Sequence, residues 1–318
     1  MERTTLGTTG IQVSRYCLGA MMFGAWGNRD HDESVDVIHA ALAAGINFID
    51  TADVYSAGES EAIVAKALQG RRDDVVLATK VHGGMGDDPN MRGNSRRWIM
   101  RECEESLRRL DTDYIDLYQC HFPDADTPIE ETMATLDGFV KAGKVRYIGC
   151  SNFSGGQIVE AQWAAERISG TPFVSLQPRY SLIARDIETD ILPTCERQGV
   201  GTLVYSPLGG GVLTGKYRRG EAPGADTRFG RQSQMRPSMA QIPERQLDVA
   251  DAVGKIAAEL GATPTAVALA WVLGRRNVTS VIIGPRTLDQ YRENAAAFTL
   301  ELPADAVSTL NAVSKAAR

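Results

Sequence analysis

The sequence is poor in the residues that build a disulfide framework or a metal centre. It has five cysteines, an odd number, and none of them forms a C-x-x-C pair, while its four histidines are scattered. These counts argue against a disulfide-stabilised secreted protein and against a zinc site. We therefore expect no metal and a reducing compartment, hence the cytoplasm.

The chain also lacks long apolar runs and a strong excess of either charge. No window approaches the ~18 consecutive apolar residues of a membrane helix, and residues 1–10 lack the apolar core of a signal peptide. Lys and Arg number 34 against 40 Asp and Glu, which gives a net charge of -6. We therefore expect neither a membrane nor a nucleic acid as partner. At 43% hydrophobic residues in 318 the composition is that of a globular protein.

What the chain does have is a regular alternation of short β-rich runs and helical patterns. The β runs are expected at residues 16–18, 46–50, 75–80, 114–121, 145–151, 173–177, 200–205 and 278–283. Helices are expected between them, for example over residues 59–68, 95–110, 188–198, 243–260 and 263–273. Repeated β-α units imply a parallel sheet. Eight units closing on themselves predict an α/β fold, a (β/α)8 TIM barrel, with an N-terminal β-hairpin around residues 7–10 and one domain over residues 1–318.

An open, doubly wound sheet is the alternative architecture. Such a sheet usually carries a G-x-G-x-x-G turn after its first strand, whereas residues 19–24 read GAMMFG. Residues 216–242, after the seventh run, have no clear period and are expected to be a long loop at the mouth of the barrel. A tolerated surface insertion is the other interpretation of this loop. Thr127 with Glu130, and Thr287 with Gln290, have the spacing of helix capping boxes.

Four polar side chains follow neighbouring strands of the expected barrel. Asp50, Lys80 and His121 end the second, third and fourth runs, and Tyr55 lies in the loop after the second. The carboxyl ends of barrel strands share one mouth, where active sites lie. A lysine next to Tyr55 would lower the pKa of its phenol, Asp50 would hold Lys80, and His121 could donate to a carbonyl oxygen. Each residue alone could be a cap, a surface side chain or a buried imidazole; the joint pattern favours a catalytic set.

The remaining strand ends suit a flat amide-bearing ring joined to phosphates. The groups that pair with amides are Ser151, Asn152 and Gln177. Tyr205 can stack on a ring, and the glycine turn at residues 209–211 lets backbone N–H groups approach phosphates. Arg286, at an expected helix start, suits an anion. Together they indicate a nicotinamide dinucleotide.

Over essentially its whole length the sequence resembles the aldo-keto reductase family. The matching segments are residues 45–55 (GINFIDTADVY), 113–121 (DYIDLYQCH), 144–153 (KVRYIGCSNF), 205–216 (YSPLGGGVLTGK) and 283–294 (IGPRTLDQYREN). The chain is more similar to the bacterial and potassium-channel β-subunit-like branches than to the mammalian steroid and aldose reductases.

The resemblance implies reduction of carbonyls by NADPH, with Tyr55 as general acid, Lys80 and Asp50 as its tuning pair and His121 as the group that orients the carbonyl. It implies cofactor contacts from Ser151, Asn152, Gln177, Tyr205, Ser206, Pro207, Leu208, Gly210, Lys216, Arg228, Gly284, Arg286, Gln290, Glu293 and Asn294. The substrate pocket is expected to be lined by Met22, Phe23, Trp26, Tyr55, His82 and Phe122.

One departure from the family concerns the choice of cofactor. Many relatives have a basic residue followed by Ser or Thr where this chain has Gly284 and Pro285. Selection of the 2′-phosphate then rests on Arg286, helped by Lys216 or Arg228. NADPH is still expected as the preferred cofactor rather than NADH.

Two other function classes stay open at the level of sequence. A cofactor-binding regulatory subunit of the same fold would show large exposed apolar patches, whereas the complete catalytic set favours an enzyme. A metal-dependent barrel hydrolase would have only His82 and His121 as histidine ligands near the mouth. The expected partner is a small-molecule carbonyl substrate, and the sequence carries no signal for an oligomeric state.

Overall fold

The computed structural model describes residues 1–235 and 241–315. The chain divides into two compact units, and the single-domain organisation stays a prediction. Unit 1 comprises Met1–Pro178, Glu188–Val204 and Asn277–Tyr291. Unit 2 comprises Arg179–Ile187, Tyr205–Arg276 and Arg292–Arg318.

Unit 1 contains a closed barrel of parallel strands, which confirms the predicted fold. The strands of the chain are β1 (Arg3–Thr5), β2 (Gln12–Ser14), β3 (Tyr16–Gly19), β4 (Phe48–Asp50), β5 (Val76–Val81), β6 (Ile115–Cys120), β7 (Val145–Ser151), β8 (Phe173–Gln177), β9 (Gly201–Val204) and β10 (Ser280–Ile283). In the barrel, β3 to β9 are neighbours in chain order, and β10 pairs with both β9 and β3. The carboxyl ends of all eight barrel strands therefore meet at one mouth.

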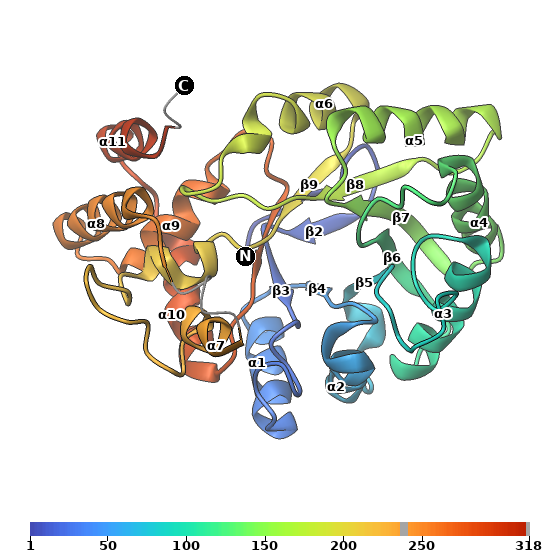
Figure 1. The fold of residues 1–318 in the computed structure, drawn as a ribbon, viewed down its shortest axis with the longest axis horizontal. Helices are drawn as coiled ribbons and strands as arrows, with labels where there is room; N and C mark the ends of the chain where they lie inside the picture. Colours follow the sequence, from blue (N-terminus) through green and yellow to red (C-terminus); the bar gives the residue numbers. More distant parts are fainter. Residues whose placement is uncertain (236–240, 316–318) are drawn as a thin grey trace. The chain divides into compact units, whose positions relative to one another are not determined.

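Helices cover the outside of the barrel strands. Those within unit 1 are α1 (His31–Ala43), α2 (Glu59–Leu68), α3 (Arg96–Arg109), α4 (Ile129–Lys141), α5 (Gly155–Arg167) and α6 (Ile191–Gln198). Figure 1 shows α1 to α5 following one another around the strands. With helices outside and packed side chains inside, strands are buried on both faces, which is why Val76–Val81 is buried at every position.

The N-terminal hairpin is formed by β1 and β2, which pair antiparallel as predicted. Its turn contains Gly7 with a φ of +57°, and a β-carbon there would lie 2.5 Å from the Val174 carbonyl oxygen. Val174 lies at the start of β8, so the hairpin turn contacts the amino-terminal end of the barrel. This end is opposite to the mouth where the predicted catalytic residues lie.

Side chains cap the starts of α1, α3, α5 and α9 (Pro264–Leu273), but one predicted cap is wrong. At α5, Ser154 and Gln157 form a reciprocal capping box. At α4, Pro128 is the N-cap residue and no side chain caps the helix. The Thr127 hydroxyl instead donates to Asp124 Oδ2 at 2.8 Å. The capping box that Thr127 and Glu130 predict is absent because a loop carboxylate binds the threonine.

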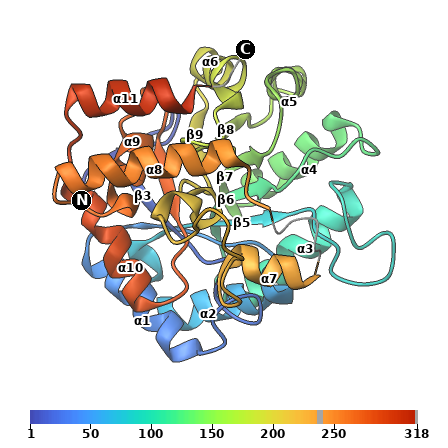
Figure 2. The ribbon, with the colours of Figure 1, turned by 60° about the vertical axis from the view of Figure 1, so that its left-hand side comes forward.

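Unit 2 is helical. Its helices are α7 (Arg228–Met235), α8 (Glu244–Glu259), α9 (Pro264–Leu273) and α11 (Ala304–Ser314), and α10 (Leu288–Ala295) crosses from unit 1 into it. Figure 2 shows α8 lying alongside α11. A small apolar core joins Val212, Tyr217 and Leu247, with Phe229 of α7 packed against it.

The segment 216–242 is therefore not a plain loop. It contains helix α7, which the sequence pattern did not predict, and residues 236–240 lie outside the described part. Elsewhere in the described chain no single helix is long and apolar enough to cross a membrane. Among these helices, only α8 and α9 taken together have the length and apolar composition of a membrane span, and the pair is bent by 101° at its junction.

Candidate active site

A buried lysine organises the mouth of the barrel. Lys80, in β5, is fully buried, and its Nζ donates to Asp50 Oδ1 at 2.6 Å and to the Thr51 carbonyl oxygen at 2.8 Å. The third contact of Nζ is the Tyr55 hydroxyl oxygen at 3.2 Å. The three donor positions of the ammonium are thus all used. The structure brings Asp50, Tyr55 and Lys80 together as predicted.

The Tyr55 ring is held by an unusual backbone. Tyr55 begins a short 3-10 turn (Tyr55–Gly58) in which Ser56 and Ala57 have φ values of 50° and 55°. This left-handed path is costly for residues with a side chain. It turns the chain back directly after the tyrosine and leaves Tyr55 only 9% exposed.

The pKa of Tyr55 moves in the direction opposite to the prediction. Burial raises the pKa of its phenol, and the Lys80 ammonium offsets only part of that rise, while Asp50 adds to it. For Lys80, burial alone would lower the pKa, but Asp50 and Tyr55 together raise it above its usual value. At neutral pH Tyr55 is therefore a neutral proton donor in contact with a permanent cation.

His121 completes the set on the neighbouring strand. It directly follows β6, and its ring lies edge-on to Tyr55, with centroids 5.6 Å apart. Burial, reinforced by the charge of Lys80 and by His82, lowers the pKa of His121 to about 2. Its Nδ1 is buried without a hydrogen-bond partner. A neutral imidazole with its proton on Nε2 fits this environment, because the unpartnered Nδ1 then needs no acceptor.

Two glutamines hold the far side of the Asp50 carboxylate. Gln119 Nε2 and Gln177 Nε2 donate to Asp50 Oδ2 at 3.1 and 2.8 Å. Gln119 was not among the predicted site residues, although a glutamine two residues before His121 inside an apolar strand is a usable signal. Gln177, predicted to bind the cofactor, donates one amide N–H to Asp50, which leaves its second N–H and its oxygen for such a contact.

Ser151 and Asn152 link three strand ends. The Ser151 hydroxyl donates to the Gln177 carbonyl oxygen at 2.7 Å, and Asn152 Nδ2 donates to the His121 carbonyl oxygen at 3.0 Å. Asn152 has a φ of +63°, a conformation that asparagine tolerates better than most residues. Both residues lie beside the predicted catalytic set, and they also fix the ends of β6, β7 and β8.

Exposed aromatic side chains flank the Tyr55 and His121 pair. Trp26 is 50% exposed with its ring 5.9 Å from that of Tyr55, and Phe122 is 46% exposed and stacked on His121 at 5.0 Å. Met22 is partly buried. Phe23 is fully buried, so its predicted role in lining the substrate pocket is wrong: it packs in the core.

A buried carboxyl group that the sequence analysis did not predict lies two residues before Tyr55. Asp53 is fully buried, and its Oδ2 has no hydrogen-bond partner. Burial, with Glu61 and Glu102 nearby, raises its pKa well above the usual value. Arg109 binds both glutamates and joins α2 to α3 beneath the loop that carries Tyr55.

Within unit 2, the glycine turn after β9 fits a phosphate group. Gly209, Gly210 and Gly211 have φ values of 57°, 70° and 91°. A β-carbon at Gly211 would lie 2.6 Å from Lys216 Nζ, and one at Gly210 would lie 3.8 Å from Arg228 Cδ. Predicted cofactor residues thus gather here as a glycine cradle with two cations beside it. This chemistry fits the diphosphate of a nicotinamide dinucleotide.

The other residues of unit 2 that are predicted to bind the cofactor differ in how far they are buried. Tyr205, Ser206 and Leu208 are partly buried, whereas Pro207 and Asn294 are buried. Glu293 is exposed and accepts a hydrogen bond from the Thr265 hydroxyl at 2.5 Å.

At the start of α10, this chain's own side chains use the backbone groups that were expected to bind an anion. The Leu288 N–H donates to Glu33 Oε1 at 3.3 Å, and the Arg286 N–H donates to Gln290 Oε1 at 2.8 Å. Asn28 Nδ2 donates both to Glu33 Oε2 and to the Arg286 carbonyl oxygen. Gly284 is exposed. The Glu33 carboxylate thus lies at the expected anion site beside Arg286.

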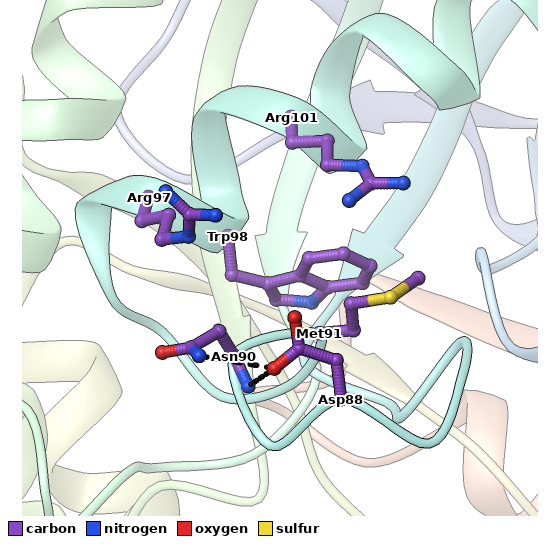
Figure 3. A pocket seen from close by; sticks show the side chains of 6 residues that line it. All are labelled: Asp88, Asn90, Met91, Arg97, Trp98 and Arg101. Atoms are coloured by element: carbon purple, nitrogen blue, oxygen red, sulfur yellow. Dashed lines mark hydrogen bonds between the residues drawn. The ribbon is translucent and has the colours of Figure 1, made fainter.

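A separate hollow of about 180 Å³ lies between the loop after β5 and the start of α3 (Figure 3). It is lined by Asp88, Asn90, Met91, Arg97, Trp98 and Arg101. The Trp98 Nε1 is buried without a hydrogen-bond partner. None of the six residues was predicted to act in the site. Within residues 1–235 and 241–315, no three His, Cys, Asp or Glu side chains gather in a way that could hold a metal ion.

Comparison with known proteins agrees with this geometry. Residues 15–315 match the model of the aldo/keto reductase family. The chain is 41% identical to an uncharacterized oxidoreductase of Bacillus subtilis, over 98% of this chain and 95% of the other. It is 38% identical to a probable voltage-gated potassium channel subunit beta of Arabidopsis thaliana (93% and 91% covered) and 35% identical to an NADH-specific methylglyoxal reductase of Escherichia coli (98% and 97%). The chain belongs to the aldo/keto reductase family.

Proposed function

We propose that this oxidoreductase reduces aldehydes or ketones to alcohols with NADPH, and that Tyr55 is its general acid. The observation that carries the proposal is the contact of Lys80 Nζ with both Asp50 and the Tyr55 hydroxyl, next to a neutral His121. A small-molecule carbonyl compound is the proposed partner. The five free, buried cysteines suit a reducing compartment, so we propose a cytoplasmic location.

His121 and Tyr55 together hold the carbonyl group, and Tyr55 also supplies the proton. The bound reduced nicotinamide supplies the hydride that reaches the carbonyl carbon. His121 Nε2–H and the Tyr55 hydroxyl both donate to the carbonyl oxygen, which polarises the C=O bond and orients it. As negative charge develops on that oxygen, the Tyr55 hydroxyl gives up its proton to it.

Lys80 stabilises the phenolate that this proton transfer leaves on Tyr55. Asp50 keeps Lys80 in place and is itself held by Gln119 and Gln177. For the cofactor, the proposed contacts are Ser151, Asn152 and the Gln177 oxygen at the nicotinamide amide, and the glycine cradle with Lys216 and Arg228 at the diphosphate. Arg286 is the proposed contact of the 2′-phosphate.

The test is the oxidation of NADPH with a reactive aromatic aldehyde, followed by absorbance. Tyr55→Phe is expected to lower kcat by about 10²–10⁴-fold, because the general acid is lost. Binding of NADPH, measured by quenching of tryptophan fluorescence, is expected to stay the same. Turnover in Tyr55→Phe close to that of the native protein would contradict the assigned role.

A regulatory subunit is the second candidate, and the similarity to plant proteins named as channel β-subunits favours it. On α5 the exposed Trp163 (62%) and Val159 lie one turn apart and form a small apolar surface suited to a protein partner. If the native protein binds NADPH but oxidises it with no carbonyl compound, this candidate replaces the enzyme. The intact set of Asp50, Tyr55, Lys80 and His121 supports the enzyme.

A further inference from the structure

His82 stands beside the catalytic pair in a continuous row of rings. It lies two residues after Lys80, and its ring centroid is 5.6 Å from that of Phe122. Phe122 stacks on His121, whose ring is in turn 5.6 Å from Tyr55. Phe122 thus contacts both histidine rings, and His82 lies close enough to His121 to contribute to the lowered pKa of its ring.

The proton of the His82 ring is fixed by a buried asparagine. Asn94 is 1% exposed, and its Nδ2 donates to the Phe122 carbonyl oxygen at 2.9 Å. That contact requires a donor, so the Asn94 Oδ1 is the atom that faces His82 Nδ1, at 3.1 Å. An amide oxygen only accepts, and Nδ1 must therefore carry the proton.

The flipped amide of Asn94 would place its oxygen against the Phe122 carbonyl oxygen, and the backbone of the residue is also held. Its backbone N–H donates to Asp124 Oδ2 at 2.7 Å, and its carbonyl oxygen accepts from the Thr132 hydroxyl at 3.0 Å. Both ends of the residue are thus anchored. In its neutral form His82 keeps a lone pair on Nε2 and no proton there.

The Nε2 atom is available to a ligand. It makes no hydrogen bond to any residue in the part of the chain that the structure describes, and it is not one of the buried unpaired polar atoms. A substrate that covers this atom must supply a donor or leave Nε2 unpaired, which weakens binding.

We propose that His82 Nε2 accepts a hydrogen bond from a hydroxyl group next to the substrate carbonyl, so that hydroxylated ketones and aldehydes are the preferred substrate class. This inference rests on the proposed reductase function and deepens it. A methyl group at the same position cannot donate, and a second carbonyl oxygen would face the lone pair. His82 thereby selects among carbonyl compounds that Tyr55 and His121 treat alike.

The test compares hydroxyacetone with butanone, which differ by a hydroxyl group in place of a methyl group. In the native protein kcat/KM is expected to be higher for hydroxyacetone. His82→Asn keeps an amide nitrogen where Nδ1 meets Asn94 but places nothing at Nε2. It is expected to lower kcat/KM for hydroxyacetone by about 10-fold and to leave butanone within about 2-fold.

Two further variants separate this role from a structural one. His82→Gln places an amide group near the Nε2 position, so its oxygen is expected to restore most of the preference for hydroxyacetone. His39→Asn, the same exchange on the outer helix α1, is expected to change neither substrate.

Equal kcat/KM for the two ketones in the native protein, or an equal fall for both in His82→Asn, would overturn the inference. Either result would leave the reductase proposal standing, because that proposal is judged by Tyr55-dependent oxidation of NADPH with the aromatic aldehyde. Loss of turnover with the aldehyde as well would remove both.

Discussion

At the scale of single residues, the site combines buried side chains that are bound to one another with side chains that face the mouth and make few hydrogen bonds. Lys80 and Asp50 are buried and bound to each other and to the glutamines around them. Tyr55 and His121 face the mouth, and the His121 imidazole makes no hydrogen bond to another described residue. Substitutions in the two groups are therefore expected to have different costs.

We expect Lys80→Met to lower the free energy of unfolding by about 3–5 kcal/mol, because it leaves the Asp50 carboxylate buried without its cation. Tyr55→Phe removes one hydroxyl group and is expected to cost less than about 1.5 kcal/mol. Unfolding in urea measures both changes. Similar losses in the two variants would contradict the division.

The low pKa of His121 gives the protein an acid-sensitive stability. In the folded protein His121 stays neutral down to a pH of about 2, whereas the unfolded chain protonates it near its ordinary pKa of about 6.5. The unfolded state thus binds more protons between these values, and stability falls as the pH falls through this window.

His121→Asn is expected to remove this dependence. Below a pH of about 6, the free energy of unfolding of the variant relative to that of the native protein should rise by up to about 1.4 kcal/mol for each unit by which the pH falls. Urea unfolding at several pH values between 5 and 7 checks the slope. A stability difference between the two proteins that does not change with pH would show that folding does not shift the pKa of His121.

At the scale of elements, the order of strands was predictable from the alternation of apolar runs and helical periods. Helix α2 and strands β7 and β8 lie at the predicted residues, because their patterns are bounded by clear turn signals. Helix α7 and the start of α4 were not predictable. Their bounds depend on contacts with residues outside the local pattern, such as Asp124 for Thr127.

The same limit explains which site residues the sequence revealed. Asp50, Lys80 and His121 could be found because each ends a strand, and strand ends share a mouth. Glu33 and Asn94 could not, since their importance comes from the partner each one meets and not from a pattern around it. Lysine next to a phenol suggested a lowered pKa for Tyr55, and only the burial seen in the fold reverses that direction.

The first turn of α10 has a testable consequence for the choice of cofactor. If the adenosine end lies at Arg286, as the family resemblance implies, a 2′-phosphate approaches the Glu33 carboxylate that holds the Leu288 N–H. A free ribose hydroxyl would instead find an acceptor there. We expect Glu33→Gln to tighten NADPH by several-fold relative to NADH, because the repulsion is removed.

The measurement is the dissociation constant of each cofactor by tryptophan fluorescence, without substrate. Asp36→Asn, a carboxylate on the same helix, is the control for the change of net charge. An equal effect of the two variants on NADPH would assign the change to long-range charge and not to the contact with α10.

At the scale of the whole molecule, the barrel of unit 1 gives its two ends different tasks. The mouth carries the proposed catalytic set, while the amino-terminal end receives the hairpin turn with Gly7 against β8. Chemistry and stability are commonly divided between these ends of a barrel. A change at the hairpin is thus expected to affect folding and leave chemistry intact.

Gly7→Ala is expected to lower the free energy of unfolding by about 2–4 kcal/mol, since the new β-carbon collides with a carbonyl oxygen and the φ is unfavourable. Gly10→Ala in the same turn is the matched control, because a β-carbon there meets nothing within 4 Å. Folded Gly7→Ala should retain the native kcat/KM. A loss of turnover at full folding would show that the two ends are coupled.

The buried lysine network also predicts which site residues would persist in a relative that has lost its activity. A descendant freed from selection for turnover could replace Tyr55 or His121 and remain folded, since Tyr55 accepts a single hydrogen bond from Lys80 and the His121 imidazole makes none with the described residues. It could not easily discard Lys80 or Asp50, whose removal breaks a network joining four strands. A relative without activity would therefore still carry the lysine and the aspartate, because they stabilise the fold. The presence of these two residues alone would not show that a relative is an active enzyme.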